Sequence, residues 1–170
     1  MNPTDFDETH EILLRLGMAT LFGAILGIDR DLHQKPAGLR VLAMVCMAAC
    51  AITMMSAMTI AEVEHAAGDG FLRTVQGLLS GIGFLGAGVI MRAQGKEEVH
   101  GLTTATSIWV CTILGVICGV GQWLLAACVF GISWSILLGG RWLEHRILAF
   151  VPQRNEEPIS KKPSSEISTP

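Results

Sequence analysis

The feature that most constrains this chain is the presence of three long stretches without Asp, Glu, Lys or Arg, at residues 41–61, 74–91 and 101–140. A helix needs about 20 apolar residues to cross roughly 30 Å of hydrocarbon. The first two stretches therefore predict one membrane-spanning helix each, and the third is long enough for two helices that separate at 119–122. A further span is predicted at 12–28, where Arg15 lies close enough to the start for its side chain to reach the interface.

These stretches predict an all-α, polytopic membrane protein with five spans, at about 12–28, 41–61, 74–91, 102–119 and 122–140. Composition agrees, because only 16% of the residues are charged, whereas about a quarter is usual in soluble domains. We expect one transmembrane domain at 11–146, preceded by an extracytoplasmic segment at 1–10. The tail at 147–170 is rich in Pro, Ser, Lys and Glu, which favours a disordered, solvated segment.

The distribution of basic residues predicts the orientation, since Lys and Arg concentrate on the cytoplasmic side of membrane proteins. With five spans, ten of the 12 Lys and Arg residues fall on one side, after the first and third spans and in the tail. On the other side Arg73 stands alone among acidic residues. The N-terminus is therefore predicted outside and the C-terminus in the cytoplasm.

The sequence also argues against several classes of function. The net charge is −3 and the basic residues are scattered, without the patch that nucleic-acid binding requires. The five His are dispersed and no nucleophile stands with a base, so we expect no enzyme, no cofactor and no metal site. The cysteines contain no CxxC pair and should be buried as small apolar side chains. They are Cys46, Cys50, Cys111, Cys118 and Cys128.

The third predicted span is rich in glycine, at Gly77, Gly81, Gly83, Gly86 and Gly88. It contains a GxGxxG pattern, but dinucleotide binding needs that pattern in a strand–turn–helix unit, not in an uncharged span. Two interpretations remain. Glycines four residues apart let helices approach closely, and the pairs Gly23/Gly27 and Gly115/Gly119 have the same spacing. Alternatively, the glycines loosen the helix and expose carbonyls along a polar path, as in discontinuous transporter helices.

Charged and hydroxyl side chains gather at the predicted cytoplasmic ends of the spans. These residues are Asp29, Arg30, Arg40, Arg92, Thr103 and Thr104. They are either interface anchors or a functional cluster in which Asp29 meets Arg40 or Arg92. Thr103 or Thr104 is placed to cap the fourth helix, whose positive end would attract an anion; the alternative is hydroxyls bonded to their own helix.

Together these segments resemble the MgtC/SapB family of bacterial inner-membrane proteins over residues 12–145. The most specific are GIGFLGAG at 81–88, GLTTA at 101–105, and Ser107 with Trp109; GIDR at 27–30, AGLR at 37–40, and Arg73 with Gln76 support them. The family usually has Glu where Asp29 stands and Thr where Val41 stands, and a shorter acid reaches less far. Longer members carry a soluble C-terminal domain, so this chain resembles the compact form.

The resemblance implies a multi-pass inner-membrane protein tied to magnesium limitation, acid stress or survival inside hosts. It implies either a non-enzymatic regulator of membrane machinery such as ATP synthase, or a small transporter or channel for Mg²⁺ or another ion. The path of a transporter would follow 81–88 and 103–107. No Asp, Glu, His or Lys lies deep in a span, and Mg²⁺ is usually held by carboxylates. We therefore favour a regulator that acts in the lipid bilayer through helix contacts, as a homo-oligomer or with another membrane complex. The glycine pairs Gly23/Gly27, Gly77/Gly81 and Gly115/Gly119 are predicted to supply its interfaces.

Overall fold

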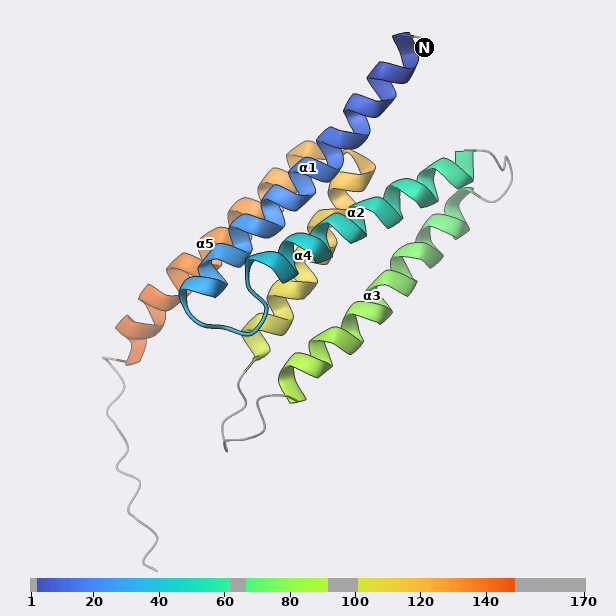
Figure 1. Cartoon of the computed structure of the whole chain (residues 1–170). Helices are drawn as coiled ribbons and strands as arrows, with labels where there is room; N and C mark the ends of the chain where they lie inside the picture. Colours follow the sequence, from blue (N-terminus) through green and yellow to red (C-terminus); the bar gives the residue numbers. More distant parts are fainter. Residues whose placement is uncertain (1–2, 62–66, 92–100, 149–170) are drawn as a thin grey trace, which may run out of the picture.

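The computed structural model of the chain describes residues 3–61, 67–91 and 101–148, with side chains described for 8–59, 69–90 and 101–139. These residues form five α-helices and no strand (Figure 1). The helices are α1 (Pro3–Leu32), α2 (Leu39–Ala61), α3 (Ala67–Met91), α4 (Leu102–Val120) and α5 (Trp123–Leu148). The predicted all-α polytopic fold is confirmed. Four helices are long and apolar enough to cross a membrane, and the described apolar part of α5, Trp123–Gly139, is shorter.

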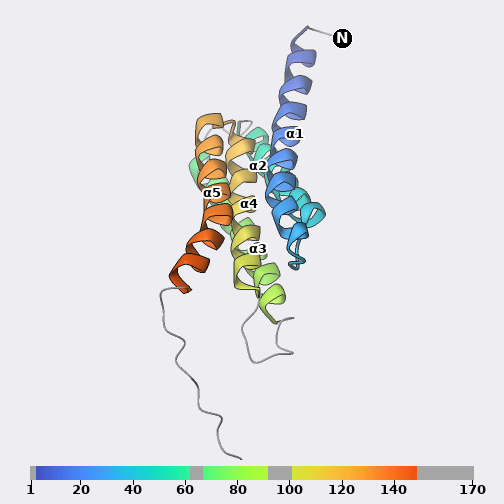
Figure 2. The ribbon, with the colours of Figure 1, turned by 90° about the vertical axis from the view of Figure 1, so that its left-hand side faces the viewer.

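The α4 helix occupies the middle of the bundle and packs against all four other helices. On one side of it lie α2 and α1, which also pack against each other, and α3 lies against both α2 and α4. The α3 and α5 helices stand at opposite edges in Figure 1, and their described residues do not contact each other. Phe22 of α1 and Phe130 of α5 are in contact, with ring centroids 4.8 Å apart and ring planes tilted by 31°. Figure 2 shows α5, α4 and α1 side by side.

Glycines bring α1, α2 and α4 into backbone contact. A Cβ atom added at Gly23 or Gly27 of α1 would lie within 2.5 Å of the α2 backbone. One added at Gly115 of α4 would lie 2.2 Å from the Cys46 carbonyl oxygen, and Gly119 is similarly close to α2. Close approach at glycine pairs is thus found for α1 and α4, as small residues at helix interfaces in membranes allow. Because both pairs are used within the chain, the prediction that they serve as interfaces to a partner is wrong.

The cysteines are all free thiols. Cys46, Cys50, Cys111 and Cys118 are buried between α2 and α4, as predicted, and contribute to the apolar core. Cys128 is exposed, so the prediction is wrong for this residue. It belongs to α5, an edge helix whose described residues contact only α4 and α1.

The predicted five crossings would place the two ends of the chain on opposite sides of the membrane. We expect an epitope tag at the N-terminus to be reached by a membrane-impermeant antibody in spheroplasts, and a C-terminal tag only after permeabilisation. A chain cut after Val120, with four crossings, should expose its C-terminal tag without permeabilisation. Full-length tags reporting from the same side would show that α5 does not cross.

Candidate functional site

Two arginines of α1 reach the two ends of the central helix α4. Arg30 Nη2 donates a hydrogen bond to Thr104 Oγ1 at 3.4 Å, and Arg15 Nη1 donates to the Gly119 carbonyl at 2.6 Å. The arginines are as far apart in α1 as Thr104 and Gly119 are in α4, which is about 22 Å along an α-helix. The equal spacing lets two antiparallel helices make both contacts at once.

The Arg30 end contains two buried charged residues in succession. Arg30 is 4% exposed and Asp29 is 7% exposed, and their charges interact electrostatically. His33 Nδ1 lies 3.5 Å from the Asp29 carboxylate, whereas Arg30 Nε is inaccessible and has no hydrogen-bond partner. Charges removed from water in this way are costly unless they are paired. Substitution of Asp29 or Arg30 is therefore expected to be poorly tolerated.

The predicted contact between Asp29 and Arg40 is not formed. Arg40 is exposed in the first turn of α2, and no ion pair joins it to Asp29 among the side chains that the structure describes. Arg92 lies outside the described residues. Of the predicted cluster, the structure brings together Asp29, Arg30 and Thr104.

The prediction that Thr103 or Thr104 caps α4 is wrong. The cap is Gly101, whose φ of 101° is in the left-handed region, and no side chain bonds to the helix start. Glycine adopts this conformation without steric cost, which leaves Thr104 inside the first turn, facing Arg30. A hydroxyl bonded to its own helix, the alternative to capping, is found at Ser107, whose buried hydroxyl donates to the Thr103 carbonyl at 2.8 Å. Trp109, the other residue predicted to be functional in this helix, is 39% exposed.

Asp31 is a structural residue at this end that sequence reasoning missed. Its Oδ2 accepts a hydrogen bond from the Leu39 backbone N–H at 2.9 Å, at the start of α2, where such groups lack partners within the helix. Gly38 lies so close to this carboxylate that an added Cβ would overlap it. The only local signal was an acid at the end of α1 shortly before the next helix. Its separation of eight residues from Leu39 matches no capping pattern.

The Arg15 end joins the same two helices by a different chemistry. Arg15 forms an ion pair with Glu11, one turn earlier in α1, and its bond to Gly119 satisfies a carbonyl in the last turn of α4. That helix end carries partial negative charge, which favours a cation. Arg15 was expected to extend toward the membrane interface, and its bond to α4 was not anticipated.

The glycines of α3 are arranged differently from those of α1 and α4. The helix is continuous, and nothing lies within 4 Å of a Cβ added at Gly77, Gly81, Gly83 or Gly88. Only Gly86 packs inward, 3.7 Å from the Ala105 side chain. At the other end of the helix, Arg73 and Gln76 are exposed.

Three of these glycines share one side of α3 with Phe84, because residues spaced by four, three and four lie on one helix face. We call this surface the glycine face: Gly77, Gly81, Phe84 and Gly88. Phe84 is 82% exposed, and the three glycines are also exposed. Gly86 is on the opposite, packed side. The glycine face is thus unused within the described part of the chain.

Comparison with known proteins gives one consistent result. The sequence model of the MgtC family matches residues 16–146. Protein MgtC of Salmonella typhimurium is 42% identical over 74% of this chain, which covers 52% of that relative. Protein SrpB of Synechococcus elongatus is 38% identical over 65% of this chain, which covers 64% of that relative. Protein SapB of Bacillus subtilis is 34% identical over 86% of this chain, which covers 62% of that relative. No solved structure matches it.

Proposed function

This chain belongs to the MgtC family, and from that premise we propose that it is a non-enzymatic regulator that binds another membrane protein through the glycine face of α3. The observation that carries the proposal is that α3, long and apolar enough to span a membrane, has few residues buried within the bundle. Only 6% of its apolar window is buried, compared with 56% of the α4 window. The face that it leaves open is the one with three glycines.

Open glycines are best explained by a neighbour outside the chain. In a helix each glycine costs roughly 0.5–1 kcal/mol relative to alanine, and Gly77, Gly81 and Gly88 gain no internal packing in return. Hydrocarbon gives helices no hydrophobic drive to associate, so close approach of backbones across small residues is the main source of affinity. A partner helix on this face would gain that close approach.

The partner is a second copy of this chain or a helix of another membrane complex, for which the family resemblance suggests ATP synthase. The link to magnesium limitation and acid stress that the resemblance implies belongs to the same proposal. A regulator of this kind needs no catalytic group. It changes the activity of its partner by favouring one arrangement of the partner's helices.

An ion path along the glycine segment is less well supported. The α3 helix is unbroken, so its carbonyls remain in the helical hydrogen-bond ladder and are not free to coordinate an ion. The Ser107 hydroxyl, at the other side of the supposed path, is bonded within α4. Purified protein in liposomes should therefore give no Mg²⁺ flux above empty vesicles. Robust flux that is lost in Gly83→Leu would refute the regulator.

The contact itself is tested by crosslinking in cells. A photoreactive amino acid at Phe84 should capture a membrane protein. Gly88→Leu should reduce capture about tenfold, the effect of a loss of about 1.4 kcal/mol in helix affinity, because the added side chain prevents close approach of the helices. The variant should fold normally, since nothing adjoins Gly88.

Gly131→Leu is the matched control, because Gly131 of α5 is also exposed and also has nothing within 4 Å. It should leave capture from Phe84 unchanged. Equal capture in wild type, Gly88→Leu and Gly131→Leu would contradict a role for the glycine face. Mass identification of the captured protein distinguishes a second copy from another complex.

A further inference from the structure

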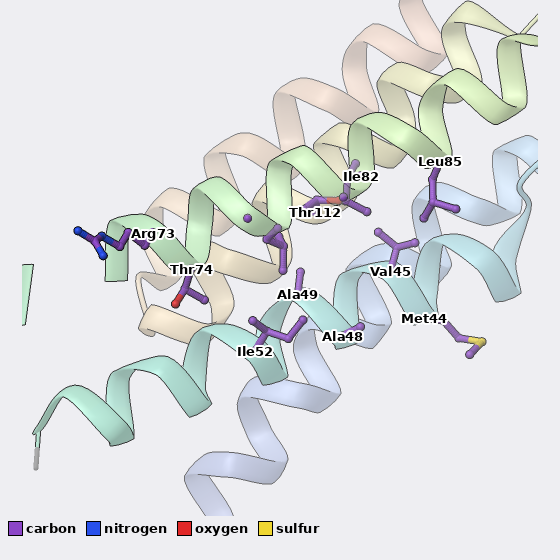
Figure 3. Close-up of a pocket in the computed structure, with 13 residues that line it drawn as sticks. Met44, Val45, Ala48, Ala49, Ile52, Arg73, Thr74, Ile82, Leu85 and Thr112 are labelled. Carbon is purple, nitrogen blue, oxygen red and sulfur yellow. The ribbon is translucent and has the colours of Figure 1, made fainter. Parts of the chain in front are cut away.

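A long apolar groove separates α2 from α3. Figure 3 shows it with side chains: Met44, Ala48 and Ile52 line it from α2, and Ile82 and Leu85 from α3. At its base Thr112 of α4 is fully buried, and its hydroxyl donates to the Ile108 carbonyl. With that hydroxyl satisfied, the groove offers an occupant little but hydrocarbon.

The dimensions of the groove suit a hydrocarbon chain better than a helix. Its volume is about 570 Å³, and from Thr74 to Leu85 α3 advances about 16 Å, so the mean cross-section is roughly 35 Å². A helix about 10 Å across needs roughly 80 Å². It would rest on the mouth of the groove, whereas an extended acyl chain can enter it lengthwise.

One end of the groove carries a cation for which the described residues supply no ion-pair partner. Arg73 borders the groove, and in Figure 3 its guanidinium points past the groove's end, away from the apolar side chains. Arg73 is exposed, and no described carboxylate pairs with it. It lies four residues, or about 6 Å, inside the span that begins at Asp69, so its side chain can extend to the headgroup level.

We propose that the α2–α3 groove binds one anionic phospholipid, with an acyl chain along the groove and the phosphate on Arg73. Bulk lipid surrounds the protein and is as apolar as the groove, so the acyl chain alone gives little preference for this site. Retention against exchange depends on the charge at Arg73 together with the shape of the groove. The groove also borders Gly77 and Gly81, whereas Phe84 and Gly88, at which the proposed regulatory contact is tested, do not line it. The inference therefore does not rest on that contact.

The test is lipid retention by the full-length chain. Protein purified in mild detergent is incubated with phosphatidylglycerol or phosphatidylcholine of identical acyl chains, and bound lipid is counted by native mass spectrometry. We expect one retained phosphatidylglycerol and a preference over phosphatidylcholine of about fivefold, the effect of one basic residue near an anionic headgroup. Arg73→Gln should remove the preference, and Ala48→Phe, which fills the groove, should remove retention of both lipids.

Ala127→Phe is the control for added bulk, because Ala127 is exposed on α5 and does not border the groove. It should retain phosphatidylglycerol as wild type does, and thermal unfolding checks that every variant is folded. Retention unchanged by Ala48→Phe would overturn the site, as would a cysteine crosslink between two copies formed through Ala48→Cys. Crosslinking from Phe84 in the Ala48→Phe variant separates this site from the proposed function, since it should persist.

Discussion

Gly115→Val is expected to destabilise the protein by about 3 kcal/mol or more, at or above the upper end of the usual cost of overpacking a core. A Cβ atom at this position would lie 2.2 Å from the Cys46 carbonyl oxygen and 2.7 Å from the Ala49 Cβ. Neither atom is the end of a flexible side chain, so the clash can be relieved only by separating α4 from α2. That movement would open the core between Leu114 and Leu42, both fully buried.

The matched control is Gly131→Val on α5, where nothing lies within 4 Å of an added Cβ. Exposed substitutions of this kind usually change stability by no more than about 0.5 kcal/mol. Thermal unfolding in detergent, followed by circular dichroism, compares the two variants with wild type. Similar unfolding temperatures for Gly115→Val and Gly131→Val would show that α2 and α4 are not in backbone contact.

The number and type of the helices were predictable because the length of an uncharged stretch relates directly to the thickness of hydrocarbon. The glycine pairs predicted close helix approach but not the neighbour. Residue spacing defines only the face of a helix, and both Gly23 and Gly81 satisfy the same pattern. One is buried against α2 and the other is open. Burial depends on how the helices are arranged around α4, which spacing within one helix does not encode.

The candidate site was predicted in part. Asp29, Arg30 and Thr104 were identified as one group because the topology places their segments at the same end of the bundle. The predicted pairing of Asp29 with Arg40 was wrong, since Arg30 and not Arg40 turns inward, and the alternative partner, Arg92, lies outside the described residues. The two arginines differ in rotation about their helices, a property set by packing and not by membrane depth. The cap of α4 was also wrong, because a glycine with positive φ takes the position that hydroxyl residues usually occupy.

Arg30→Leu is expected to destabilise the protein by about 1–3 kcal/mol, the usual penalty when buried polar groups lose their partners. Asp29, which is 7% exposed, would then be left without the neighbouring cation. The Thr104 hydroxyl would also lose its bond to α1. Arg40→Leu removes the same charge from an exposed position and should stay within about 0.5 kcal/mol of wild type. Unfolding in detergent measures both.

A second substitution distinguishes the electrostatic cause from the loss of packing. If the carboxylate left without a neighbouring cation is the main penalty, the double variant Asp29→Leu/Arg30→Leu should be more stable than Arg30→Leu, because it also removes that buried charge. The charge exchange Asp29→Arg/Arg40→Asp should be no more stable than the single variant Asp29→Arg, since Asp29 and Arg40 are not paired. Recovery in the charge exchange together with none in the double leucine variant would place Arg40, and not Arg30, beside Asp29.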